Sequence, residues 1–139
     1  MSFANRFLAA VVCVVLAFSI NATANETNCS DASLNGSYGL HASGNIGVVP
    51  YSAVGRFVFD GKGNLHGTLW SRLNQQNVVE TLTGTSSVNS TCVVTDTWNL
   101  SSGVTTTHIS MIVDNGTGYV ILNNTSPSPS NVSGEARKQ

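Results

Sequence analysis

Asp96 and His108 are the residues in this chain whose types and spacing fit acid–base chemistry. Between them, Ser101-Ser102-Gly103 has the composition of a three-residue loop that closes a β-hairpin. With that loop at the centre, Asp96 lies directly opposite His108 on the neighbouring strand. A carboxylate beside an imidazole fixes the tautomer of the ring and stabilises its protonated form, as a general acid or base requires. Asp96 and His108 are therefore candidate catalytic residues.

The following turn extends this pair into a polar row. Asn115-Gly116 is typical of a type I′ turn, and it places Asn123 beside His108, with Trp98 and Tyr119 on the same face. The opposite face of these strands is more uniformly apolar and carries Val93, Ile109, Met111, Val120 and Leu122. We therefore expect this apolar face to be core and the polar row to be an outer ladder, worth a fraction of a kcal/mol. The catalytic interpretation is the alternative.

The stretch 53–73 predicts the clearest hairpin in the chain. Its loop, Asp60-Gly61-Lys62-Gly63-Asn64, has two glycines for positive φ and an aspartate whose side chain can cap the turn. The register that this loop sets places one apolar set on one face, namely Phe57, Phe59, Leu65 and Leu69. We expect that face to be core, and Trp70 to point outward beside Val54.

The rest of the chain after Cys29 has the same β character. Six further segments are predicted strands, 37–43, 78–88, 92–100, 104–113, 118–124 and, as a possible closing strand, 132–138. Val, Thr and Ile are frequent in 78–88, 92–100 and 104–113, as pleated surfaces favour. Turn signals recur every 8 to 12 residues or so, and after the first 24 residues no stretch has apolar residues at helical spacing. The pattern predicts an all-β fold, an antiparallel meander β-barrel of about eight strands. We expect 126–130, rich in Ser and Pro, to be an exposed loop.

The first 24 residues have the features of a secretory signal peptide. Arg6 precedes an apolar run from Phe7 to Ile20, and Ala22-Thr23-Ala24 is a small-x-small cleavage site. The run is shorter than the roughly 20 residues of a membrane span. We expect a single secreted domain over 25–139, extracellular or periplasmic.

Cysteine usage agrees with export. Of three cysteines, Cys13 lies in the leader, and Cys29 and Cys92 remain in the mature chain. An oxidising compartment usually closes such a pair, so we predict a Cys29–Cys92 disulfide. The chain has no CxxC spacing and no cluster of histidines, so we expect no metal and no cofactor.

Charge is sparse: 9% of residues are charged and the formal net charge is −1. Without a basic stripe the chain is not expected to bind nucleic acid. His41 and His66 have no acidic neighbour in the pattern and are expected to be satisfied or solvated histidines rather than ligands. Arg72 and Glu80, which flank a polar loop, are expected to be solvated.

Large aromatic residues suggest a second kind of site. Tyr38, Phe57 and Phe59 are predicted to face inward, and with Trp98 they are candidates to line an apolar ligand cavity in a barrel of about eight strands. A filled core is the alternative arrangement of the same residues.

Three segments carry a resemblance to small exported bacterial proteins of uncharacterised function. They are Cys29…Leu34-x-Gly36-x-Tyr38-Gly39, Gly55-x-Phe57-x-Phe59-Asp60-Gly61-Lys62-Gly63-Asn64-Leu65-x-Gly67, and Thr83-Gly84-Thr85-x-x-Val88-Asn89-x-x-Cys92. A final Gly134-x-Ala136-Arg137 is similar to their last strand, whereas Ser86 stands where an aromatic is common. The resemblance implies a compact barrel like those of the lipocalin and allene oxide cyclase/dirigent kinds, which include ligand carriers and cyclases.

These observations leave three classes of function open. The first is a binding module for a small apolar molecule. The second is a structural or surface-interaction protein with an extracellular partner. The third is an enzyme of the isomerase or cyclase type, for which Asp96 and His108 would be the catalytic pair.

Overall fold

The computed structural model describes residues 28–125 and 130–139. The predicted signal peptide and all but the last residue of the predicted 126–130 loop lie outside the described residues. Eight strands follow one another: β1 (Asn35–Ile46), β2 (Val49–Asp60), β3 (Asn64–Leu73), β4 (Gln76–Val88), β5 (Val93–Leu100), β6 (Thr105–Val113), β7 (Gly118–Asn123) and β8 (Ser130–Lys138). Two single turns of 3₁₀ helix accompany them, η1 (Asp31–Ser33) before β1 and η2 (Asp114–Gly116) between β6 and β7.

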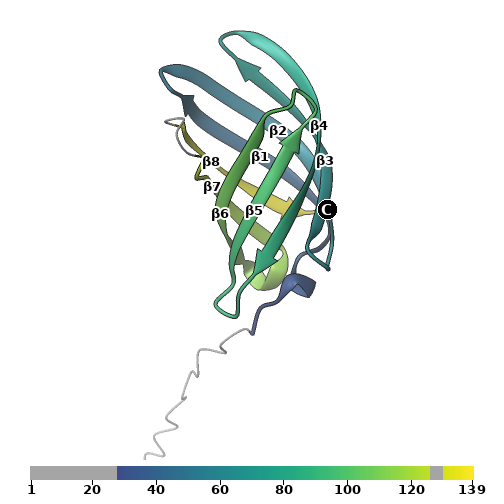
Figure 1. Cartoon of the computed structure of the whole chain (residues 1–139). Coiled ribbons are helices and arrows are strands. Elements are labelled where there is room, and N and C mark those ends of the chain that lie inside the picture. Colours follow the sequence, from purple (N-terminus) through teal and green to yellow (C-terminus); the bar gives the residue numbers. More distant parts are fainter. Residues whose placement is uncertain (1–27, 126–129) are drawn as a thin grey trace, which may run out of the picture.

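The strands form a closed antiparallel barrel in which each pairs with its neighbours in the sequence and β8 pairs with β1. Figure 1 shows this meander, with strand connections alternating between the two ends of the barrel. The prediction of an all-β barrel of about eight strands is confirmed. No helix in the described part of the chain is long and apolar enough to cross a membrane.

Turn chemistry sets the register as predicted. Asp60 Oδ1 accepts hydrogen bonds from the backbone N–H groups of Lys62 (2.8 Å) and Asn64 (2.9 Å), so Phe59 lies opposite Leu65. At the other predicted turn Asn115 has φ 54° and ψ 40°, the left-handed conformation of a type I′ turn. These loops fix which residues are neighbours across the strands.

The end of the barrel that carries the Asp60 loop is filled by aromatic side chains. The rings of Tyr38 and Tyr119 each pack edge-on against Phe59, with centroids 5.5 and 5.6 Å apart. Tyr38 also donates a hydrogen bond to the carbonyl oxygen of Gly116 (2.6 Å). All three rings are buried, so this half of the interior is solid core.

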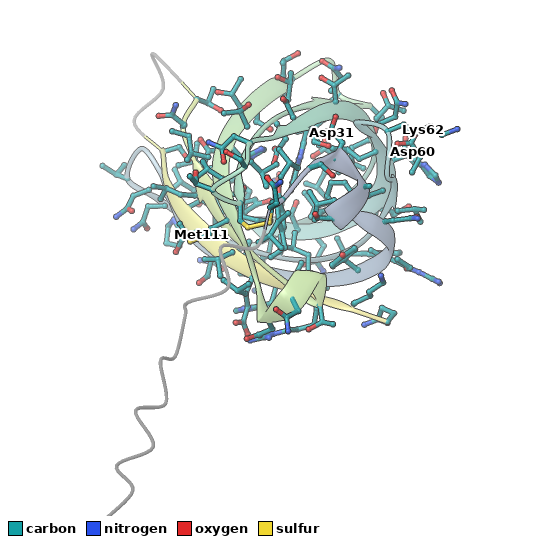
Figure 2. All side chains as sticks on the ribbon, turned by 90° about the horizontal axis from the view of Figure 1, so that it is seen from below. Asp31, Asp60, Lys62 and Met111 are labelled. Atoms are coloured by element: carbon teal, nitrogen blue, oxygen red, sulfur yellow. A yellow bond between two sulfur atoms is a disulfide. The ribbon has the colours of Figure 1, made fainter. Side chains whose placement is uncertain are left out.

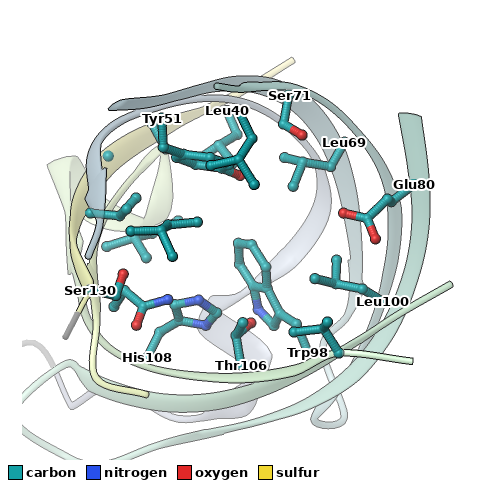
Figure 3. Close-up of a pocket in the computed structure, with 18 of the residues that line it drawn as sticks. Leu40, Tyr51, Leu69, Ser71, Glu80, Trp98, Leu100, Thr106, His108 and Ser130 are labelled. Carbon is teal, nitrogen blue, oxygen red and sulfur yellow. The ribbon is translucent and has the colours of Figure 1, made fainter. Parts of the chain in front are cut away.

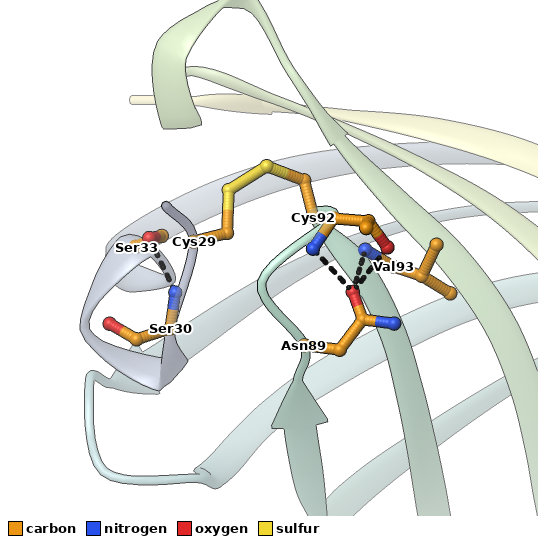
Figure 4. Close-up of a disulfide and its surroundings, with 7 residues drawn as sticks. Cys29, Ser30, Ser33, Asn89, Cys92 and Val93 are labelled. Carbon is orange, nitrogen blue, oxygen red and sulfur yellow. Dashed lines mark hydrogen bonds between the residues drawn. A yellow bond between two sulfur atoms is a disulfide. The ribbon is translucent and has the colours of Figure 1, made fainter. Parts of the chain in front are cut away.

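The chain before β1 closes the same end. Figure 2 views the barrel from below and shows η1 lying across it. Asp31 of η1 accepts a hydrogen bond from the backbone N–H of Val88 (2.8 Å), and Leu34 is buried beneath. The predicted disulfide is present: Cys29 is bonded to Cys92, with Cα atoms 5.0 Å apart (Figure 4). The segment before β1 is therefore held against the barrel by packing, a hydrogen bond and a covalent bond.

The structure corrects the predicted orientation of β5, β6 and β7. Asp96 and His108 of the polar row point into the barrel and are buried. Of the five residues expected as core on the opposite face, Val93 is half-buried and the other four turn outward: Ile109, Met111, Val120 and Leu122 are 44 to 52% exposed. The prediction failed because Asp96, His108, Ser110 and Tyr119 satisfy one another by hydrogen bonds, so the inner face does not have to be the more apolar one.

Candidate ligand cavity

A cavity of about 330 Å³ lies above the aromatic core and is open at the other end of the barrel. Figure 3 shows side chains from all around the barrel pointing into it. Its walls are mostly aliphatic, and they include Leu40, Leu69, Leu100, Ile121 and Val132. A cavity of this size and lining is typical of sites for small, mainly apolar molecules.

Trp98 and His108 are central to the cavity wall. Their rings lie 4.1 Å apart between centroids, and the ring of Phe57 packs against Trp98 from the core side at 4.7 Å. Across the sheet Trp98 faces Gly84, where a Cβ atom would lie 2.1 Å from the Thr97 carbonyl oxygen. Glycine at this position lets β4 and β5 approach closely where the indole is held.

Behind His108, Asp96 is a fully buried carboxylate that gathers three polar side chains. Its Oδ1 lies 2.7 Å from Nδ1 of His108, and its Oδ2 accepts from the hydroxyl of Tyr119 and, at 3.5 Å, from Ser110. Burial and the Asp96 charge raise the pKa of Tyr119 well above its ordinary value, so this phenol stays a neutral donor. Asp96 thereby orients His108 and leaves Nε2 as the ring nitrogen not engaged by the carboxylate.

A second polar group lies nearer the opening. Tyr51, Ser71 and Glu80 all line the cavity, and Figure 3 shows the Glu80 carboxylate pointing inward. Burial and the nearby Glu80 carboxylate raise the pKa of Tyr51 to about 12. Glu80 was expected to be solvated, but it is half-buried because its neighbour by two residues, Leu82, belongs to the inner face of β4.

Two buried polar atoms have no hydrogen-bond partner within the described residues, Trp98 Nε1 and Ser130 Oγ. Both residues line the cavity. A buried indole N–H usually finds a partner, and each unsatisfied group costs about 1–3 kcal/mol. The structure therefore concentrates its unsatisfied polar atoms around the same space.

The predicted ligand residues fall into two groups. Trp98 lines the cavity, whereas Tyr38, Phe57 and Phe59 belong to the core beneath it. Sequence reasoning missed Tyr51 and Glu80. Glu80 lies two residues before Leu82, which is buried, so the period-2 alternation of a strand puts both on one face.

Outside the cavity, the predictions for exposed residues hold. His41 and His66 are exposed, and Trp70 lies beside Val54 on the outer wall, where it is 49% exposed. Over 28–125 and 130–139, His, Cys, Asp and Glu side chains form no group of three or more that could hold a metal ion.

Comparison with known proteins supports the fold and goes no further. No protein-family model and no curated protein matches the chain. Among solved structures, it is similar to a redesigned β-barrel, with a TM-score of 0.59 and 13% sequence identity over 78% of this chain and 94% of the other. At that identity the likeness shows a shared barrel architecture only.

Proposed function

We propose that this chain is a secreted binding module that holds a small, largely apolar molecule in the open cavity of its barrel. The observation that carries the proposal is the cavity itself: about 330 Å³ of mostly apolar space, open at one end and backed by a solid core at the other. The unsatisfied Trp98 Nε1 and Ser130 Oγ beside it add support, because bound ligands commonly satisfy such groups.

Secretion is part of this proposal. The Cys29–Cys92 disulfide is compatible with an oxidising compartment, and the leader over residues 1–24 has signal-peptide features. Cleavage near Ala24 would be seen as a new N-terminus in the mass of the exported protein.

Tryptophan fluorescence offers a direct test. The chain has two tryptophans, Trp98 at the cavity and Trp70 on the outer wall, so the Trp70→Phe variant reports from the cavity alone. Titration with linear alcohols of increasing length should show affinity rising about fourfold per CH₂, or about 0.8 kcal/mol, until the cavity is full.

Two neighbouring residues of β6 provide a matched pair of blocking variants. Thr106 lines the cavity and Thr107 is exposed on the outer wall. In the Trp70→Phe background, Thr106→Phe should abolish alcohol binding and Thr107→Phe should leave it unchanged. Equal loss in both variants, or no binding of any alcohol, would contradict the proposal.

Proton-transfer catalysis is a second candidate function, favoured by the Asp96–His108 pair. His108 lines the cavity and is held by a carboxylate behind it, which is the arrangement of an oriented general base. An isomerisation fits this pair, because His108 Nε2 would take a proton from one atom of the substrate and return it to another without a cofactor. Deuterium uptake from D₂O into a bound molecule, lost in His108→Gln, would support it.

The expectation of an extracellular surface partner stays a prediction. Its place would be the outer face of β6 and β7, where Ile109 pairs with Leu122 and Met111 with Val120, all four being exposed. Light scattering over a range of protein concentrations distinguishes self-association from a strict monomer.

A further inference from the structure

Glu80 is the one carboxylate among the described residues that line the cavity. It lies on β4 opposite Leu69, and its side chain points inward from the wall, as Figure 3 shows. Within the described residues it has no hydrogen bond or ion pair, and Tyr51 is the group whose titration responds to its charge. A carboxylate in this position is turned toward the space that a ligand would fill.

The charge around the cavity has one sign. No lysine or arginine is found among the lining residues in the described part of the chain, and His108 is the other ionisable group besides Tyr51. In mostly apolar surroundings the field of one carboxylate is weakly screened, so it favours a cation and opposes an anion.

Aromatic groups reinforce this preference. Tyr51 lines the same part of the cavity as Glu80, and Trp98 presents its ring to the interior. The faces of such rings attract a cation as well as an alkyl chain. A carboxylate, two aromatic rings and aliphatic walls together complement a molecule with a protonated amine and an apolar body.

Resting on the proposed binding function, we propose that the cavity selects amphiphilic amines, with the ammonium group held by Glu80. The ammonium donates hydrogen bonds to the carboxylate, which has no hydrogen-bond or ion-pair partner among residues 28–125 and 130–139. The apolar body of the amine packs deeper, against Leu40, Leu69 and Trp98.

Three probes that differ only in their head group test the inference: octylamine, 1-octanol and octanoate, titrated into the disulfide-bonded mature protein by calorimetry. The amine should bind about tenfold more tightly than the alcohol, and octanoate about tenfold more weakly. The preference should shrink between about 20 mM and about 500 mM NaCl, because salt screens the charge.

Substitution of Glu80 locates the source of that preference. Glu80→Gln should bring octylamine and octanol to within about twofold of each other, with the octanol affinity preserved, because only the charge is lost. Glu135→Gln removes the same charge from the exposed surface of β8 and should leave the preference intact.

The outcomes separate the two proposals. If none of the three probes binds the wild-type protein, the binding function fails and the head-group inference fails with it. If the probes bind equally, if octanoate binds most tightly, or if Glu80→Gln keeps the amine preference, the inference fails and the binding function stands. If Glu80→Gln does not fold, the wild-type selectivity and its salt dependence decide.

Discussion

Asp96 owes its place inside the barrel to the donors that surround it. Trp98 and Tyr119 share its face and are buried, and large aromatic side chains contribute more buried surface per residue than Val or Ile. These two aromatic residues were visible in the sequence and favour the Asp96 face, although the opposite face carries more apolar residues. The pairing of Asp96 with His108 followed from the predicted register of β5 and β6. The hydrogen bond from Tyr119 could not be foreseen, because Tyr119 lies on β7 and reaches Asp96 only once three strands lie side by side.

Replacing Asp96 with Asn tests the energy of this network. The NH₂ group of the asparagine is a donor, and it would face His108 or Tyr119, which themselves donate to the carboxylate in the wild type. Buried polar atoms would then be left without a partner. We expect Asp96→Asn to lower the free energy of unfolding by about 2 kcal/mol in urea titrations at neutral pH. The outward-facing change Thr95→Val on the same strand should stay within about 0.5 kcal/mol, and an equal effect of both would contradict the buried network.

Asp60 predicts a pH dependence of stability. Hydrogen bonds from the side chain and backbone of Asn64, and then from the backbone of Lys62, lower its pKa from 3.8 to about 2. A carboxyl whose pKa is lowered by folding stabilises the protein above its unfolded pKa and loses that contribution as the pH falls through the folded pKa. The stability difference between the wild type and Asp60→Ala should therefore be constant near neutral pH and shrink as the pH falls from 3.8 to about 2.

Urea unfolding of both proteins at a series of pH values measures that difference. A difference that stays constant down to pH 2 would show that the loop does not bind the carboxylate in its charged form.

At the scale of elements, register and orientation were not equally predictable. Loops such as Asp60–Asn64 and Ser101–Gly103 have residue types that allow few geometries, and they set which residues face one another across the strands. Which face of a strand points inward depends on the whole barrel. In β6, Ile109 and Met111 point outward, whereas His108 and Ser110 point inward. The composition of β6 alone predicts the opposite orientation, because its apolar residues lie on the outer face.

Two adjacent residues of β6 test this orientation. Ile112 is 7% exposed and Met111 is 49% exposed. Ile112→Ala should cost about 2–5 kcal/mol through lost burial and the cavity left behind, whereas Met111→Ala should cost under about 1 kcal/mol. Urea unfolding of the two variants measures both values, and a larger loss for Met111→Ala would reverse the assignment of the faces.

At the scale of the whole molecule, the sequence pattern predicted a closed meander but not how its interior is divided. Tyr38, Phe57 and Phe59 were expected either to line a cavity or to fill a core, and in the structure they belong to the core. Tyr38, Phe57 and Phe59 fill the end nearer η1, while shorter side chains such as Ser71 and Thr106 leave space at the other. This division arises from the sum of side-chain volumes at each level, which no single strand reveals.

The disulfide is predicted to be the main covalent contribution to stability. It closes a loop with a sequence separation of 63 residues, and the chain-entropy relation gives about 4 kcal/mol for a loop of this length. The double variant Cys29→Ser/Cys92→Ser should lose about that much in urea unfolding while its far-ultraviolet circular dichroism stays that of a β-protein. A loss below about 1 kcal/mol would mean that the unfolded chain without the disulfide retains structure that already holds residues 29 and 92 close together.

Because the core and η1 close one end, the described residues leave one route into and out of the cavity, at the other end. An obstacle on a shared route raises the barrier for entry and for exit by the same amount. Bulk added at the rim, out of reach of the bound molecule, therefore slows association and dissociation equally and leaves the equilibrium constant unchanged. The rim can therefore change the rates of entry and exit without changing the affinity, whereas the walls set the affinity and, through it, the residence time as well.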